Sequence, residues 1–152
     1  MPRSLARRYR FLSVATVPFK LITPIAVRFD GEAELVIAVG TEGETGILPH
    51  HAPYLTTVRP GLLRANVIDG GATKRLEMAT GEGFLQVLPD RITLLVDAAF
   101  ERNEVDIDAA RRERAEASER QSSAGGDLEK WRHEQSIIDF ANAKLQVAGM
   151  GQ

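Results

Sequence analysis

The chain has no cysteine and few aromatic residues. Its 152 residues include one Trp, two Tyr and six Phe. The absence of Cys excludes disulfides and thiolate metal sites, and it fits a reducing compartment. With so few aromatic side chains, the core is expected to consist mainly of Val, Leu and Ile. No apolar run approaches the roughly 18 residues that a transmembrane helix needs.

A strong charge of either sign is also lacking. The 19 Lys and Arg residues nearly balance the 21 Asp and Glu residues, which gives a net charge of -2. This balance offers no case for binding nucleic acid or an anionic membrane surface.

Acidic residues are absent from the start of the chain, where none precedes Asp30. The basic residues among the first 20 are Arg3, Arg7, Arg8, Arg10 and Lys20. The short apolar run that follows is broken by Ser and Thr, so it is not a secretory signal. An organellar transit peptide would have this composition. We interpret residues 1–18 as a disordered basic N-terminal extension, because chain termini are commonly disordered.

Between residues 19 and 102, short apolar segments alternate with Gly and Pro turns. Asp69-Gly70-Gly71 is the strongest local hairpin signal, between strands predicted at 62–68 and 74–79. The other predicted strands cover residues 19–24, 33–39, 84–88 and 91–96. Short strands at this spacing, without helical patterns between them, predict a β-sandwich or barrel.

The composition changes after residue 102, and residues 103–152 are predicted to form an antiparallel helical hairpin. Residues 106–121 contain no Gly or Pro, and Asp106 and Asp127 are suited to cap the two helices. Apolar residues recur at helical spacing in the second helix, which favours a place in the hairpin core for Trp131, with an interface anchor as the alternative. The predicted fold class is α+β, with the strands first and the two helices last.

The buried face of the first helix would consist almost entirely of Ala, with Ile107 as its one large apolar residue. Burying a methyl group gains little compared with the roughly 1.5–3 kcal/mol of a whole Leu or Ile side chain. A hairpin docked through such a face could undock without unfolding the β-domain. A permanently packed hairpin would have the same pattern, so both readings stay open.

The densest cluster of turn residues is Gly43-Glu44-Thr45-Gly46-Ile47-Leu48-Pro49-His50-His51-Ala52-Pro53, followed by Arg59-Pro60-Gly61. Gly and Pro at this density predict a shaped loop of the kind that carries recognition residues. The later motifs are Gly81-Glu82-Gly83-Phe84-Leu85-Gln86-Val87-Leu88-Pro89 and Asp106-Ile107-Asp108. With these motifs in this order, the chain resembles the epsilon subunit of bacterial and chloroplast F-type ATP synthases, from about residue 19 to about residue 150.

This resemblance implies a small β-sandwich followed by two helices, in a subunit of the central rotor stalk that holds no catalytic site. The implied partners are the gamma subunit, the ring of c-subunits and, when the helices extend, the alpha/beta catalytic head. The subunit would couple rotation of a proton-driven ring to the head and inhibit ATP hydrolysis through its helices. It would lie peripherally at the cytoplasmic face of the bacterial plasma membrane.

Glu44 and His51 match loop positions that face the c-ring in the family, so we expect them to contact the ring. The alternative is a solvated Glu and a His bonded within its own loop. His50 stands where the family usually has Gly, and this departure would alter the turn that presents the loop.

Some bacterial members of the family bind ATP as a regulator, and the resemblance implies Glu101, Asp108 and Arg111 as the corresponding residues here. Phe140 and Lys144 stand where those members have Arg, and Phe140 cannot offer a bidentate phosphate contact. We therefore expect no cofactor, and we interpret Asp108 and Arg111 as a capping acid and a helix-face cation.

The helices also carry cations that could meet acidic surfaces of the catalytic head, unless they are simply solvated. These residues are Arg112, Arg114, Arg120, Lys130, Arg132 and Lys144. No metal site is expected, because the adjacent residues His50 and His51 point apart. His133, with Glu129 and Glu134 nearby, is interpreted as part of a solvated helix face.

Two other interpretations of the sequence remain. Gly81-Glu82-Gly83 precedes a strand rather than a helix, so it is predicted to be a turn or bulge and not a phosphate loop. A free-standing nucleotide-binding β-sandwich with a helical lid is the alternative function, which ATP binding by the isolated chain would favour. An enzyme ranks last, because nothing assembles a nucleophile, a base and an orienting acid.

Overall fold

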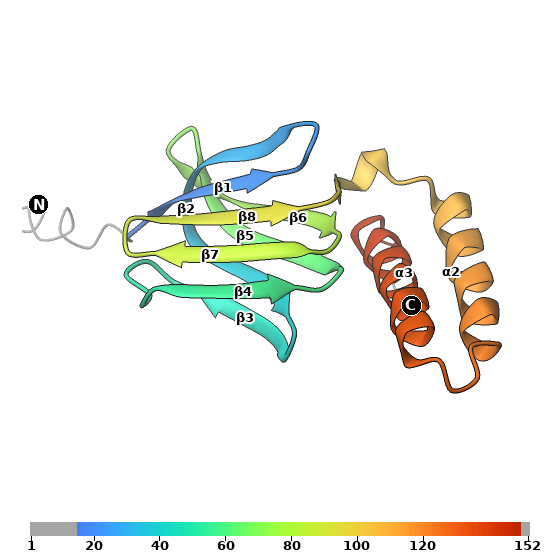
Figure 1. Ribbon diagram of the computed structural model, residues 1–152. Coiled ribbons are helices and arrows are strands. Elements are labelled where there is room, and N and C mark those ends of the chain that lie inside the picture. Colours follow the sequence, from blue (N-terminus) through green and yellow to red (C-terminus); the bar gives the residue numbers. More distant parts are fainter. Residues whose placement is uncertain (1–14, 150–152) are drawn as a thin grey trace, which may run out of the picture.

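The computed structural model describes residues 15–149, in which strands are followed by a short 3-10 helix and two α-helices (Figure 1). The strands are β1 (Val17–Ile22), β2 (Val27–Gly40), β3 (Gly43–Ile47), β4 (Tyr54–Val58), β5 (Gly61–Asp69), β6 (Ala72–Thr80), β7 (Gly83–Leu88), β8 (Arg91–Val96) and β9 (Ala99–Phe100). The helices are η1 (Arg102–Glu104), α2 (Ile107–Ser122) and α3 (Leu128–Val147). Of the predicted extension at 1–18, residues 1–14 lie outside the described part of the chain. Its last two residues, Val17 and Pro18, belong to β1.

The strands form two layers that share β2. The first half of β2 pairs with β1, and its second half pairs with β5 and β3. The β1 layer therefore holds β1, β8, β7 and β4, and the β5 layer holds β3, β5, β6 and β9. β1 runs parallel to β8, whereas the other pairs are antiparallel. This arrangement confirms the predicted sandwich.

The core lies between the two layers and is mainly aliphatic, as predicted. Its most buried side chains come from alternate positions of the strands, which point to one face of a sheet. They are Phe19, Leu21, Val36, Ile47, Leu63, Met78, Leu85, Val87, Ile92 and Leu94. All the members of this cluster come from the strands, so the sandwich has a hydrophobic core of its own.

Two local predictions about the strands had different outcomes. The β5–β6 hairpin is confirmed, and Gly70 and Gly71 both take the positive φ that a tight turn of this kind requires. The prediction of a loop across 43–53 was wrong for its first part, because Gly43–Ile47 is strand β3, paired with Val36–Gly40. Among residues 15–149, β3 pairs with β2 alone, so β3 is an edge strand.

The two helices begin where their capping residues predict. Asp106 Oδ1 accepts a hydrogen bond from Ala109 N at 3.0 Å, and Asp127 Oδ1 accepts one from Lys130 N at 3.1 Å. α3 lies between the sandwich and α2, and it packs on β5 and β6 (Figure 1). The α+β fold class is therefore confirmed, with the hairpin resting on the outer face of the β5 layer.

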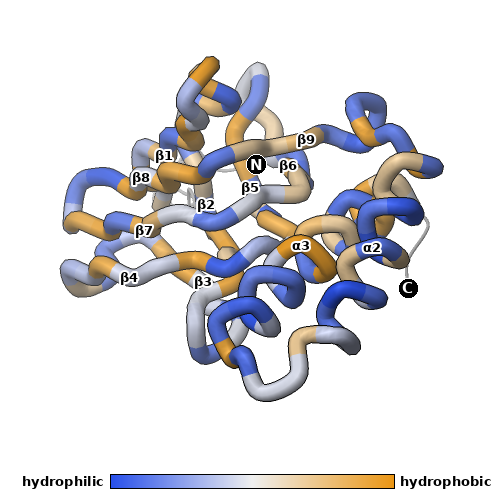
Figure 2. Tube along the Cα trace, turned by 45° about the vertical axis from the view of Figure 1, so that its right-hand side comes forward, coloured by the Kyte–Doolittle hydropathy of each residue, from blue (hydrophilic) through white to orange (hydrophobic). Residues whose placement is uncertain are grey.

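α2 is hydrophilic along most of its length (Figure 2). Its buried residues are Ala110 and Ala117, as the alanine-rich pattern predicts. Across from it, Glu134 of α3 is only 5% exposed and accepts a hydrogen bond from Arg120 Nε at 3.1 Å. The interpretation of Glu134 as solvated was wrong, because the helices meet through a polar seam as well as through alanine methyls.

Trp131 was also wrongly placed in the hairpin core. Its side chain is 44% exposed near the start of α3, close to Leu128, which is 56% exposed. The first residues of α3, 128–133, are all exposed. In the described part of the chain, no helix is long and apolar enough to cross a membrane.

Candidate interaction surfaces

The loop between β3 and β4 is built on a tight turn. His51 N donates a hydrogen bond to Leu48 O at 3.3 Å, and Pro49 occupies the second position of the turn. His50, at the third position, has φ 65°, a positive value. Pro in the second position with a positive φ in the third is the pattern of a type II turn, which favours Gly there. The residue that departs from the family pattern thus adopts the conformation that Gly adopts most easily.

We predict that two substitutions of His50 affect the free energy of unfolding differently. His50→Val should lower the free energy of unfolding by about 1–2 kcal/mol, because a β-branched residue is strained at positive φ. His50→Gly should leave it unchanged or raise it, because Gly carries no Cβ penalty. Urea denaturation measures both, with His51→Val as the control at a neighbouring position. Equal losses in the Val and Gly variants of His50 would contradict this account of the turn.

His51 is half-buried and is oriented by its own loop. Its Nδ1 donates to the Ala52 carbonyl at 2.7 Å, and its ring centroid lies 6.0 Å from that of Tyr54. Because Nδ1 is occupied, Nε2 is the ring nitrogen left for a partner. Leu48 and Leu55, which lie on either side of His51 in the sequence, are 60% and 69% exposed. The loop therefore presents Nε2 of an oriented His51 ring near exposed apolar side chains.

Glu44 lies elsewhere, near the start of β3, so the length of that strand separates it from His51. Its carboxylate forms an ion pair with Arg64 of β5, with 2.6 Å between Oε1 and Nη2. The Glu44 side chain is still 58% exposed. The structure thus gives Glu44 an internal partner and leaves it accessible, and no described contact joins it to His51.

The implied nucleotide residues are not gathered in one place. Glu101 precedes η1 and lines a cleft of about 740 Å³ between β6, η1 and the end of α3. Asp108 and Arg111 are exposed and do not line this cleft. Phe140 packs on Phe100, with 5.8 Å between the ring centroids. The structure therefore does not bring Asp108 and Arg111 to the cleft that Glu101 lines.

Three of the six helix cations are engaged within the hairpin. Lys144 Nζ lies 3.1 Å from Glu113 Oε2 and above the rings of Phe100 and Phe140. Arg114 donates to Asn142 Oδ1 at 3.2 Å, and Arg120 pairs with Glu134. The remaining three, Arg112, Lys130 and Arg132, are exposed, and the structure gives them no partner among residues 15–149. In this docked arrangement these three side chains are therefore accessible to another protein.

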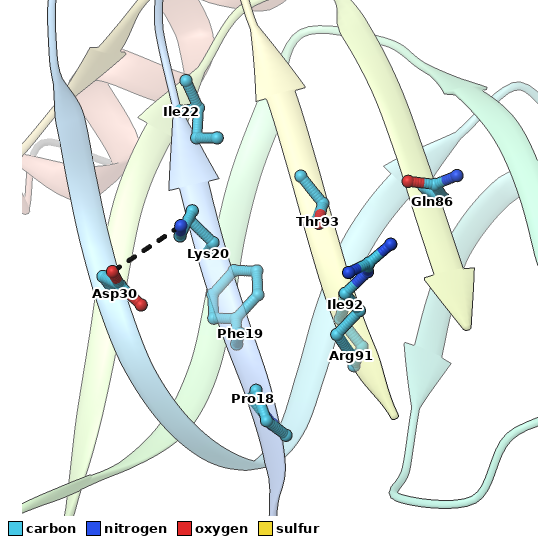
Figure 3. Close-up of a pocket in the computed structure, with 9 residues that line it drawn as sticks. All are labelled: Pro18, Phe19, Lys20, Ile22, Asp30, Gln86, Arg91, Ile92 and Thr93. Atoms are coloured by element: carbon cyan, nitrogen blue, oxygen red, sulfur yellow. Dashed lines mark ion pairs between the residues drawn. The ribbon is translucent and has the colours of Figure 1, made fainter. Parts of the chain in front are cut away.

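The outer face of the β1 layer carries a surface that sequence reasoning missed. Ile22, Leu95 and Phe84 are in register across β1, β8 and β7, and Leu95 and Phe84 are 45% and 54% exposed. A shallow cleft of about 420 Å³ continues the face toward the other end of the strands (Figure 3). Lys20 and Arg91 line this cleft, and Lys20 pairs with Asp30 at 3.8 Å. Alternation in β7 and β8 could assign Phe84 and Leu95 to a sheet face, but it does not tell whether another element covers that face.

Comparison with known proteins settles the family. The model of the β-sandwich domain of ATP synthase delta/epsilon chains matches residues 16–102. The chain belongs to this family. An ATP synthase epsilon chain from Syntrophobacter fumaroxidans is 35% identical over 132 residues, which are 87% of this chain and 95% of that protein. One from Rhodospirillum rubrum is 36% identical over 115 residues, or 76% of this chain and 84% of that protein.

Solved structures have the same fold at low sequence identity. A chain in the Euglena gracilis mitochondrial ATP synthase (OSCP/F1/c-ring) matches with a TM-score of 0.69 and 18% identity, covering 88% of this chain and 81% of that one. A chain in the Tetrahymena thermophila central stalk and c-ring matches with a TM-score of 0.60 and 16% identity, covering 88% and 97%. The resemblance to F-type ATP synthase epsilon subunits is thereby confirmed for the family and for the fold.

Proposed function

We propose that this chain is a non-catalytic rotor subunit of the central stalk in a proton-translocating F-type ATP synthase. It couples rotation of the c-ring to the catalytic head and restrains ATP hydrolysis through its helical hairpin. Family membership supports the assignment to the complex. The complex would hold the chain at the cytoplasmic face of the bacterial plasma membrane.

The observation that carries the regulatory part of this proposal is the small interface between hairpin and sandwich. Its buried members are Ala79 of β6 with Ala143 and Val147 of α3. Half-buried residues surround them: Leu62, Phe100, Val105 and Phe140. Beyond this cluster, Ser136 of α3 donates a hydrogen bond to Glu82 of the β6–β7 turn. Because the sandwich keeps a separate core, the hairpin can leave it at a cost well below that of global unfolding.

The two helices can also part from one another. Their seam combines buried alanines with the Arg120–Glu134 pair and the Gln121–Gln135 hydrogen bond, and such polar groups can exchange partners with water or another protein. An extended hairpin would expose Lys144 and Arg114 beside Arg112, Lys130 and Arg132. This cationic surface suits acidic regions of the alpha/beta head.

The surfaces of the sandwich divide between two partners in this proposal. His51 in the β3–β4 loop and Glu44 at the other end of β3 would contact polar loops of the c-ring. The broad outer face of the β1 layer, with Phe84 and Leu95, would contact the gamma subunit. Contiguous exposed apolar residues of this kind mark protein interfaces.

Removing residues 106–152 from the assembled complex tests the regulatory claim. The cut leaves the sandwich and η1 intact, so the truncated chain should still assemble. We expect ATP hydrolysis to rise severalfold while ATP-driven proton pumping is retained. Unchanged hydrolysis would refute the inhibitory role and leave coupling alone.

Phe84→Asp tests the proposed gamma surface. A charge in the centre of this apolar face should weaken binding to isolated gamma at least tenfold, because apolar anchors at interface centres dominate affinity. The melting temperature should stay unchanged, since Phe84 is 54% exposed. Leu128→Asp is the matched control, an exposed apolar residue on the hairpin instead. If both variants bind gamma like the unmodified chain, this face is not the interface.

Calorimetry with ATP separates the proposal from the alternative of a free-standing nucleotide-binding sandwich. We expect no tight binding by the isolated chain, because Asp108 and Arg111 do not share the cleft that Glu101 lines. Tight binding would favour the alternative function.

A further inference from the structure

The segment between β9 and α2 is tied to the sandwich by one side chain from far away in the sequence. The Arg28 guanidinium, on β2, donates a hydrogen bond to Glu104 Oε1 at the end of η1. Both side chains are partly buried, with 20% of Arg28 and 38% of Glu104 exposed. A linker that needed only to connect two domains would not require such a bond.

The same carboxylate also closes η1 on itself. Glu104 Oε1 accepts a second hydrogen bond from Glu101 N at 2.9 Å, and Glu104 N donates to Glu101 O at 3.0 Å. The hydrogen bond between these two side chains lowers the pKa of Glu104 and raises the pKa of Arg28. Both groups are therefore charged at neutral pH, and charge-assisted hydrogen bonds are stronger than neutral ones.

The contacts that hold the hairpin to the sandwich are separate from this pair. They include the apolar cluster around Val147, the Lys144 ammonium above the Phe100 ring and the hydrogen bond from Ser136 to Glu82. None of these contacts involves Arg28 or Glu104, so undocking can break them and leave the Arg28–Glu104 pair intact. The first linker residue beyond the pair, Val105, does belong to the apolar cluster and would be released with it.

We propose that the Arg28–Glu104 pair keeps η1 on the sandwich when the hairpin undocks, so that the hinge is Val105–Asp106. This rests on the proposed function only in that the hairpin undocks. Both hinge residues have extended backbone, with φ -83° and ψ 125° at Val105 and φ -85° and ψ 101° at Asp106. Rotation about the Val105 dihedrals and about φ of Asp106 breaks neither the bonds within η1 nor the cap of α2, because the Asp106 side chain then moves together with the helix.

The position of the hinge determines how far α2 can travel. With the pair intact, only Val105 and Asp106 lie between the fixed Glu104 and the start of α2. Without it, residues 101–104 join the flexible linker, and each adds up to about 3.3–3.6 Å of reach. Arg28 is thus a positioning residue, which would limit where the hairpin can meet the catalytic head.

Amide hydrogen exchange of the full chain tests this inference. In the unmodified protein the Glu104 amide should exchange more slowly than the Ala110 amide of α2, because undocking exposes α2 and not η1. Arg28→Ala should accelerate exchange at Glu104 roughly tenfold, as expected for losing a charged hydrogen bond in a partly exposed site. Arg28→Lys, which keeps the charge without the planar guanidinium, should be intermediate. Lys20→Ala, which removes the exposed Lys20–Asp30 pair of the β1–β2 ribbon, should change nothing at Glu104.

The outcomes distinguish the hinge from the function on which it rests. The inference is overturned if the amides of Glu104 and Ala110 exchange at the same rate in the unmodified chain while sandwich amides stay protected. It is also overturned if Arg28→Ala leaves the Glu104 amide unchanged. Exchange of Ala110 as slow as that of Met78 would instead refute hairpin mobility. Even then, the response of Glu104 to Arg28→Ala decides whether the pair holds η1.

Discussion

Gly83→Ala is expected to destabilise the sandwich by at least about 3 kcal/mol. A Cβ at this position would lie 1.7 Å from the carbonyl oxygen of Leu95 and 2.8 Å from the Cα of Val96. These atoms belong to the backbone of β8, so no side-chain rotation can relieve the overlap. Gly83 also pairs with Val58 of β4 on its other side, which prevents β7 from moving away. Such a loss is a large part of the 5–15 kcal/mol that stabilises a typical domain.

Two other glycines provide controls for this prediction in urea denaturation. A Cβ at Gly81 would lie 1.8 Å from Asp97 Oδ1, but that atom ends an exposed side chain that can rotate. Gly81→Ala should therefore cost less than Gly83→Ala. Gly126 has no atom near its would-be Cβ, so Gly126→Ala should be neutral or slightly stabilising. Similar losses for Gly81→Ala and Gly83→Ala would contradict the backbone clash.

The parts of the fold that could be predicted from sequence depend on local signals. The β5–β6 hairpin follows from Asp69-Gly70-Gly71, because the turn residues and the flanking strands are adjacent in the chain. The helix starts follow from Asp106 and Asp127, each of which caps its own first turn. In these elements, local preference and tertiary structure agree.

The errors arose where distant residues decide the structure. β3 contains two glycines and has little strand propensity, and pairing with Val36–Gly40 makes it a strand. Trp131 is exposed and Glu134 is buried, the reverse of what the sequence predicted, because burial on α3 depends on where the sandwich and α2 cover the helix. The Arg28–Glu104 pair joins residues 76 positions apart, so no local pattern could indicate it.

For the candidate surfaces, resemblance supplied Glu44 and His51, whereas physical reasoning alone supplied only a dense turn. The structure adds that His50 holds a positive φ in that turn and that Glu44 already has Arg64 as a partner. The outer face of the β1 layer could not be foreseen, because the alternation of Phe84 and Leu95 fits either a covered or an exposed sheet face. Only the topology shows that no described element covers it.

Val147→Asp is expected to release the hairpin while leaving the sandwich folded. Val147 is 6% exposed in the small cluster with Ala79 and Ala143, and it lines a cleft that Lys74, Arg75 and Arg102 also line. Burying a carboxylate among the apolar side chains of this cluster costs several kcal/mol in desolvation. The cheaper response is therefore undocking, which gives the carboxylate access to water. Amides of α2 and α3 should exchange at least about a hundredfold faster, and the melting temperature of the sandwich should change by only a few degrees.

The functional consequence of Val147→Asp follows from competition between two positions of the hairpin. If docking on the sandwich holds the helices away from the catalytic head, then abolishing it makes the inhibitory position more populated. The assembled complex with this variant should hydrolyse ATP more slowly than the unmodified complex, opposite to the effect of removing residues 106–152. Gln146→Asp places the same charge at an exposed neighbouring position and should change neither exchange nor hydrolysis. Loss of the sandwich together with the hairpin would mean that the two form one cooperative unit, because the docked cluster would then belong to the core on which the strands depend.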